Sequence, residues 1–205
     1  MKKIVMKKIM NYVKNNTKYN DTQLLEIEYG LTGIYLTISK MIIISIISLF
    51  LGIFKDMIIF MVLFNIIRTF AFGLHATKSW ICLISSAIIF VGVPLISHYL
   101  TLNLLLKLFI GILCIIFIFK NSPADTKKRP IVSIRRRLIL NYISTTIAII
   151  FVILSLIINN DYISNCLIFS LILENILISS LVYKFFNLPY NNYIDFLKSH
   201  PDFNN

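Results

Sequence analysis

Long apolar runs separated by short polar breaks constrain this 205-residue chain more than any other feature. A helix needs ~20 consecutive apolar residues, within a range of ~17–25, to cross the hydrocarbon core of a bilayer. The sequence therefore predicts an all-α, polytopic integral membrane helical bundle with about six transmembrane helices, made of about four full spans and two that can be shorter. The candidate helices are Ile34–Phe54, Met57–Ile67 (reaching Phe72 if Arg68 is included), Ile81–Leu100, Leu102–Phe119, Leu138–Ile158 and Ile163–Phe186.

The apolar content excludes a soluble globular protein. Hydrophobic residues make up 58% of the chain, whereas soluble domains contain roughly 45–50%, so lipid must be the solvent for most of the surface. The first apolar run starts near residue 31, which is too late for a cleavable signal peptide. We expect one uncleaved membrane domain over 1–205. Its parts are an N-terminal amphipathic segment (1–30), helices one to four (31–119), a basic loop (120–137), helices five and six (138–186) and a tail (187–205).

The N-terminal segment has two interpretations. Apolar residues recur there at helical spacing from Ile4 to Val13, with lysines on the other positions, and such a helix lies in the membrane interface. A basic leader that only fixes the orientation of the chain explains the same pattern equally well.

The charge distribution predicts the orientation. The net charge is +11, and six of the 20 Lys and Arg lie between Lys2 and Lys18 while seven lie between Lys120 and Arg137. Such clusters mark cytoplasmic segments and attract anionic lipid headgroups. Because an even number of spans separates the two clusters, both face the cytoplasm, as do both termini and the connection 68–82. Nucleic acid is not an expected partner, since so little of the chain lies in water.

The polar interruption between the second and third runs contains a candidate catalytic pair, His75 and Cys82. On one continuous helix they would stand roughly 10 Å apart, too far for proton transfer, which needs heavy atoms about 3 Å apart. A break at Gly73 and a helix capped by Ser79 would put Cys82 in the first turn of that helix, where the helix dipole and Lys78 favour a thiolate. The alternative is a packed cysteine and an interfacial histidine.

The other cysteines and histidines give no comparable signal. Cys114 and Cys166 lie in apolar runs without a histidine or cation beside them, so structural packing is expected for both. Three cysteines far apart indicate no disulfide framework. His98 and His200 are expected to be solvated. No metal-ligand spacing or phosphate-binding glycine loop is present, so no cofactor is assigned.

Three segments resemble the accessory gene regulator B family, membrane endopeptidases that process quorum-sensing propeptides in Gram-positive bacteria. They are Arg68…Gly73-Leu74-His75-Ala76…Cys82, then Ser122-Pro123-Ala124-Asp125-Thr126-Lys127-Lys128-Arg129-Pro130, and more weakly Glu28-Tyr29-Gly30-Leu31 ahead of Lys40. Their order matches the family over most of the chain. One departure is Phe72, which stands where the family usually carries the first of two glycines.

The resemblance implies a Cys82–His75 dyad, with no third member that can be assigned. His75 would accept the Cys82 proton, and the thiolate would attack a peptide bond to form a thioester. An internal cysteine or serine of the propeptide would then close a thiolactone or lactone ring. The resemblance also implies an active site on the cytoplasmic side of the cell membrane and a homodimer.

Further residues are candidates for substrate contact. Arg68 could stabilise the oxyanion or hold a substrate carboxylate, although snorkelling to the headgroups explains it equally well; Gly73 and Lys78 are candidates for the same role. The family's propeptides combine an amphipathic leader with an acidic C-terminal tail. Cations that could receive this tail are Lys127, Lys128, Arg129, Arg135, Arg136 and Arg137. Orientation alone also accounts for these cations, and Asp125 could be a turn or helix cap.

Charged residues inside the apolar runs suggest the main competing function. Lys40, Lys107 and Glu174 each cost roughly 2.5–3.5 kcal/mol at the centre of a bilayer, so they should face protein or water. We expect structural pairing, for example of Lys40 with Glu174. If the three lined a path instead, the chain would be a small transporter or peptide exporter without proteolytic activity.

Overall fold

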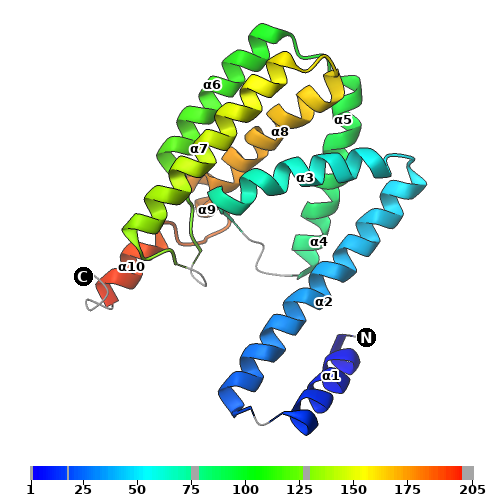
Figure 1. The fold of residues 1–205 in the computed structure, drawn as a ribbon, viewed down its shortest axis with the longest axis vertical. Helices are drawn as coiled ribbons and strands as arrows, with labels where there is room; N and C mark the ends of the chain where they lie inside the picture. The colour runs from blue at the N-terminus through cyan, green and yellow to red at the C-terminus, as the bar shows by residue number, and fades with distance from the viewer. Residues whose placement is uncertain (1, 18, 75–78, 127–129, 200–205) are drawn as a thin grey trace. The chain divides into compact units, whose positions relative to one another are not determined.

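The computed structural model describes residues 2–17, 19–74, 79–126 and 130–199, and these residues are almost entirely helical (Figure 1). The predicted all-α class is confirmed, because the described segments contain no β-strand and only an isolated bridge between Phe72 and Ala124. The chain forms two compact units, Met1–Leu51 and Gly52–Asn205. The single membrane domain expected from the sequence stays a prediction.

The N-terminal unit consists of helices α1 (Lys2–Asn16) and α2 (Asp21–Phe50). The Asn20 side chain accepts a hydrogen bond from the backbone N–H of Gln23, and the Gln23 side chain accepts one from the backbone N–H of Asn20. This reciprocal cap satisfies two donors that a helix start leaves unpaired. Because of it, α2 begins well before the apolar run at Ile34, and the expected 1–30 segment includes the first turns of the spanning helix.

The C-terminal unit begins with α3 (Phe54–Ala71) and continues, after the connection to Ser79, with α4 (Ser79–Ala87), a π-helical segment (Ile88–Gly92) and α5 (Val93–Tyr99). Together the last three make one helical span. Pro94 has no N–H to donate, so the regular α-helical hydrogen-bond pattern cannot continue through it. The wider π-helical segment ends two residues before this proline, near the kink that the sequence predicts.

The remaining helices are α6 (Leu104–Asn121), α7 (Ile134–Ile157), α8 (Asp161–Ile178), α9 (Ser180–Phe185) and α10 (Asn192–Ser199). The prediction of one helix over Ile163–Phe186 is wrong at its end. Ser179 adopts an extended backbone, with φ −70° and ψ 130°, and its side chain caps α9. The chain therefore breaks between α8 and α9 inside an apolar run.

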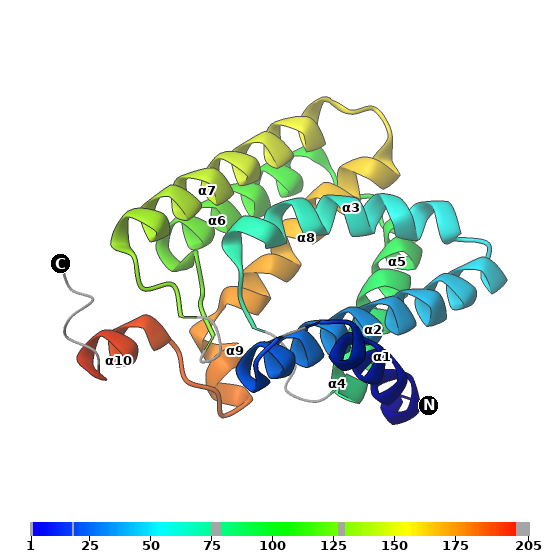
Figure 2. The same cartoon turned by 60° about the horizontal axis from the view of Figure 1, so that its bottom comes forward.

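Helices α6, α7 and α8 lie side by side, and α3 packs against α7 and α8 (Figures 1 and 2). The main core lies between these helices and includes Ile67, Ile118, Leu171 and Ile178, all fully buried. A second cluster joins Phe60 and Phe64 of α3, Cys166 of α8 and Phe90 of the π-helical segment. This packing fixes the C-terminal ends of α3 and α8 next to each other.

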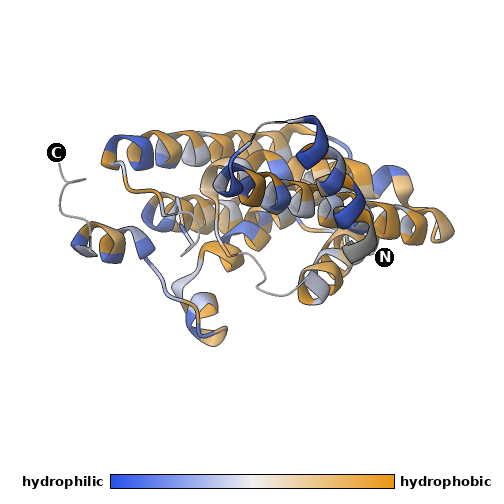
Figure 3. Ribbon diagram, turned by 90° about the horizontal axis from the view of Figure 1, so that it is seen from below, coloured by the Kyte–Doolittle hydropathy of each residue, from blue (hydrophilic) through white to orange (hydrophobic). Residues whose placement is uncertain are grey.

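The surface of the spanning helices is apolar. Within the described residues, five helical segments are long and apolar enough to cross a membrane, and at most half of each is buried inside the protein. Figure 3 shows hydrophobic residues running along these helices. The chain is therefore a multi-pass membrane protein. The second of the six predicted helices, α3, carries Lys55, Asp56 and Arg68 and is not among these five segments.

The contact between α6 and α7 predicts an effect of a single methyl group. A Cβ atom on Gly111 would lie 2.7 Å and 2.8 Å from the two methyl groups of Val152. Gly111→Ala should lower the free energy of unfolding by about 1–3 kcal/mol because the helices must separate. Denaturant titration in mixed micelles measures this change. Gly33→Ala in α2 is the matched control, since its new Cβ meets nothing within 4 Å; equal losses in both variants would contradict the packing.

Candidate functional site

The two sequence motifs of the C-terminal unit meet in space. Residues Phe72 and Ala124 form a parallel bridge, in which the Gly73 N–H donates to the Ala124 carbonyl (2.8 Å) and the Ala124 N–H donates to the Ala71 carbonyl (3.0 Å). The Ala71 carbonyl belongs to the last turn of α3, where it has no partner within the helix. The segment that leads to His75 is thus attached to the start of the basic loop.

The backbone at this junction leaves the helix sharply. Phe72 has φ 61° and ψ −132°, and Gly73 has φ 107°. Positive φ is unfavourable for any residue with a Cβ atom. A Cβ on Gly73 would also lie 2.5 Å from Arg68 Nη1 and 2.8 Å from the Leu177 carbonyl oxygen. Glycine is therefore required at 73, and Phe72 holds a strained conformation that a glycine would adopt without strain.

Arg68 organises the same turn. Its Nη1 donates to the Phe72 carbonyl and its Nη2 to the Leu74 carbonyl. Nη1 also lies 3.4 Å from Glu174 Oε1, in an ion pair between α3 and α8. The guanidinium thus has partners inside the protein, and neither the oxyanion nor the headgroup role is needed to explain its position.

Leu74 is fixed through both of its backbone groups. Its N–H donates to the Leu177 carbonyl (2.9 Å), and its carbonyl accepts from Arg68. The Leu177 carbonyl lies in the last turn of α8 and has no partner within the helix. Helices α3 and α8 therefore both hold the residue that immediately precedes His75.

Asp125 joins the basic loop to the C-terminal tail. Its buried carboxylate accepts hydrogen bonds from the backbone N–H groups of Asn192 (3.0 Å) and Tyr193 (2.9 Å), the first residues of α10. A carboxylate at a helix N-terminus satisfies unpaired donors and complements the helix dipole. Asp125 is thus a helix cap, one of the two roles that the sequence suggests, but the helix that it caps lies more than 60 residues further along the chain.

Arg137 and Tyr183 complete this polar cluster. Arg137 Nη1 lies 3.5 Å from Asp125 Oδ2, its Nη2 donates to the Pro123 carbonyl (3.2 Å), and its guanidinium stacks 3.7 Å over the Tyr193 ring. The Tyr183 hydroxyl donates to the Asp125 carbonyl (3.0 Å). Burial raises the pKa of Tyr183, so its phenol remains a donor at neutral pH.

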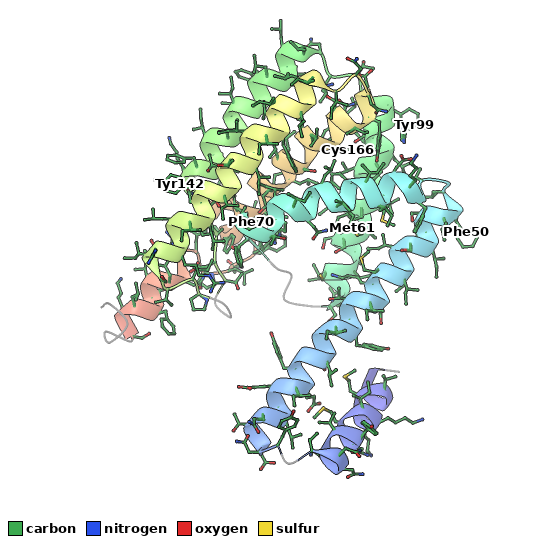
Figure 4. The ribbon with its side chains drawn as sticks, viewed as in Figure 1. Phe50, Met61, Phe70, Tyr99, Tyr142 and Cys166 are labelled. Atoms are coloured by element: carbon green, nitrogen blue, oxygen red, sulfur yellow. The ribbon has the colours of Figure 1, made fainter. Side chains whose placement is uncertain are left out.

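Cys82 lies in the first turn of α4 and is half-buried, in agreement with the helix start expected near Ser79. Its proposed partner His75 and the neighbouring Lys78 lie outside the described residues, so the distance between the imidazole and the thiol stays a prediction. Cys114 and Cys166 are buried among helices, and none of the three cysteines is in a disulfide. Figure 4 places Cys166 in the bundle, where its Sγ lies 3.7 Å from Ser97 Oγ.

The candidate tail-binding cations differ in exposure. Arg135 and Arg136 are exposed at the start of α7, whereas Arg137 is engaged with Asp125 and Tyr193 and has only 17% of its side chain exposed. Lys127, Lys128 and Arg129 lie outside the described residues. Among the three described cations, Arg137 therefore has partners within the protein, whereas Arg135 and Arg136 are exposed.

Sequence reasoning missed several partners. The sequence suggested that Glu174 pairs with Lys40, but the ion pair of Glu174 is made by Arg68. Lys40 belongs to the other compact unit, and its own pairing stays a prediction.

Lys107 donates to Ser164 Oγ (2.8 Å) and lies 3.8 Å from Asp161 Oδ1. His98 is exposed, as expected, and its Nε2 also lies 3.0 Å from Asp56 Oδ2, a partner that the sequence did not suggest. No signal in the sequence pointed to Leu177 or α10.

No cluster of three or more His, Cys, Asp or Glu side chains that could hold a metal ion is present in the described ranges.

The fold and this site define a multi-pass helical membrane protein whose half-buried cysteine follows an anchored turn. A family model described as Accessory gene regulator B matches residues 6–178. The chain therefore belongs to the accessory gene regulator B family.

Similar proteins agree with this assignment. An AgrB-like protein of Clostridium acetobutylicum is 30% identical over 199 residues, which is 95% of each chain. Accessory gene regulator protein B of Staphylococcus aureus (strain MRSA252) is 30% identical over 153 residues, which covers 74% of this chain and 80% of the relative. No solved structure matches the chain.

The strained backbone at Phe72 yields a prediction that isolates one methyl group. Phe72→Gly and Phe72→Ala both remove the ring, so they differ only in the conformational cost at φ 61°. The glycine variant should be more stable to unfolding by about 1–2 kcal/mol, measured by denaturant titration in mixed micelles. A more stable alanine variant would contradict the backbone geometry described at this residue.

The Asp125 cap predicts coupling between the basic loop and the tail. Asp125→Asn removes the charge that holds the N-terminus of α10 and Arg137, so α10 should detach more often. Limited proteolysis should cut between 186 and 199 at least about fivefold faster. Asp161→Asn, at an exposed carboxylate that begins α8, is the control and should leave the cutting rate unchanged. Equal rates in wild type and Asp125→Asn would contradict the cap.

Proposed function

We propose that this chain is a membrane cysteine endopeptidase that cleaves a quorum-sensing propeptide and supports its cyclisation. Family membership supports an accessory gene regulator role. The observation that carries the proposal is the anchored turn 72–74, which fixes the chain immediately before His75 while Cys82 opens the following helix. A nucleophile next to a base needs such fixed backbone on both sides, since small displacements cost large factors in rate.

The proposed reaction proceeds in two acyl transfers. His75 accepts the proton of the Cys82 thiol, and the thiolate attacks the carbonyl carbon of the scissile peptide bond. The C–N bond breaks, His75 returns the proton to the leaving amine, and a thioester remains on Cys82. An internal cysteine or serine of the propeptide then gives its proton to His75 and attacks the thioester, which releases a thiolactone or lactone and the Cys82 thiolate. Excluding water from the site prevents hydrolysis of the thioester.

The expected partners follow from charge and hydropathy. A short propeptide with an amphipathic leader would lie in the interface beside the enzyme, and its acidic tail would meet exposed cations such as Arg135 and Arg136. Anionic lipids compete for the same cations. We place the site and both termini at the cytoplasmic face of the cell membrane of a Gram-positive bacterium, and we expect a homodimer. Neither a cofactor nor nucleic acid is required.

The contacts of the charged residues favour this function over transport. A transport path needs ionisable groups that face water within the membrane. Lys107 is instead buried against Ser164 and Asp161, and Glu174 is buried against Arg68. Both groups therefore have structural partners, which leaves the transporter without a specific observation in its favour.

Replacing the nucleophile tests the proposal directly. Cys82→Ala should reduce the release of the C-terminal fragment from a tagged propeptide by at least about 1,000-fold, because the thioester cannot form. Intact-mass measurement of the wild-type enzyme should detect the acyl group on the peptide that contains Cys82. The Cys114→Ala variant, at a cysteine buried in α6, is the matched control and should cleave within about twofold of wild type.

Undiminished cleavage by a correctly inserted Cys82→Ala protein would rule the peptidase out. Peptide export that survives in Cys82→Ala without any cleavage would instead support the transporter.

A further inference from the structure

We propose that Glu174 is a positioning residue of the peptidase, acting through Arg68 on the turn that immediately precedes His75. The inference rests on the proposed function. It assigns a role in that function to a residue of α8 that lies outside both motifs. Glu174 is fully buried, and Oε1 lies 3.4 Å from Arg68 Nη1. Arg68 in turn donates to the carbonyls of Phe72 and Leu74. The chain of contacts thus runs from α8, through one guanidinium, to the residue before His75.

The free-energy cost of burying this ion pair indicates that it does more than stabilise the fold. Burying a carboxylate and a guanidinium costs several kcal/mol per ion, and replacing such pairs by apolar residues is often neutral or stabilising. Here the second carboxylate oxygen, Oε2, is buried and has no hydrogen-bond partner in the part of the chain that the structure describes. A pair kept only for stability would be expected to satisfy both oxygens. What the pair does supply is a fixed direction for the guanidinium.

The direction of the guanidinium matters because two backbone carbonyls of the turn accept hydrogen bonds from this one side chain. The carbonyls of Phe72 and Leu74 are two residues apart and are reached by different nitrogens of Arg68. Only a planar guanidinium offers two donors in a rigid fork, and a lysine ammonium does not. Without Glu174, Arg68 could rotate toward the headgroups, as long cationic side chains do. Glu174 therefore holds the fork against the turn, and α8 also contributes the Leu177 carbonyl that accepts from Leu74.

The pH dependence of Cys82 alkylation tests the proposal without a propeptide. Purified protein in nanodiscs is treated with iodoacetamide between pH 5.5 and 9, and the peptide containing Cys82 is quantified by mass spectrometry. A thiolate paired with an imidazolium reacts well below pH ~8.5, where free thiols ionise. At pH 6.5 the wild type should therefore react about tenfold or more faster than His75→Ala.

Glu174→Gln keeps the shape of the side chain and removes its charge. We expect this variant to lose most of the low-pH reactivity, by about tenfold at pH 6.5, while its rate at pH 9 stays near that of wild type. Ser170→Ala, a buried position one turn away on α8 whose hydroxyl bonds only the Cys166 carbonyl among the described contacts, is the matched control and should keep the wild-type profile. Arg68→Lys provides a second test, with the same loss expected because the fork is gone.

The possible outcomes distinguish the positioning role of Glu174 from the proposed peptidase function. In one outcome His75→Ala abolishes the reactivity at low pH, but Glu174→Gln and Arg68→Lys leave it intact. This result would overturn the positioning role of Glu174 and support the Cys82–His75 dyad. A wild-type profile that His75→Ala does not change would overturn the proposed function itself. A profile that Ser170→Ala alters as much as Glu174→Gln would reduce Glu174 to a general packing residue and overturn its specific role.

Discussion

Pairing of the backbone N–H and carbonyl groups around residues 71–74 is the constraint on which the rest of the site depends. Inside a membrane protein, non-helical backbone persists only where the protein satisfies its polar groups. The N–H groups of Gly73 and Leu74 donate to Ala124 and Leu177, the Ala71 carbonyl accepts from Ala124, and Arg68 satisfies the carbonyls on either side of Gly73. The chain can leave α3 abruptly before His75 because each of these groups has a partner.

These partners join the two segments on which the family resemblance rests, which lie about 50 residues apart in sequence, into one structural unit. The first supplies the turn and the arginine, and the second supplies the backbone that pairs with the turn. Asp125, the residue after Ala124, extends the connection to the C-terminal tail by capping α10. The tail and the turn are therefore bound to two adjacent residues, Asp125 and Ala124.

The sequence predicts those features that depend on local composition. Apolar length identifies the spans, Pro94 locates the irregular helix, and the pattern around Ser79 places Cys82 in a first helical turn. The break at Ser179 was missed because a serine within an apolar run is compatible with a helix, and only the capping of α9 reveals it. The pairing of Phe72 with Ala124 and of Glu174 with Arg68 depends on how helices pack, and no local pattern encodes it. The sequence suggests Lys40 as a partner of Glu174 because both are charged residues in apolar runs, yet the packing of α3 on α8 brings Arg68 to Glu174.

Amide hydrogen exchange at the turn measures its anchoring most directly. With the protein in nanodiscs, fragmentation mass spectrometry at single-residue resolution should find the amides of Gly73, Leu74 and Ala124 exchanging at least about 100-fold more slowly than in an unstructured peptide. Protection at all three amides is the result that joint anchoring by α3, α8 and the basic loop requires. Exchange at peptide-like rates at Gly73 and Ala124 would show that the two motifs do not pair. That result would contradict the anchored turn before His75.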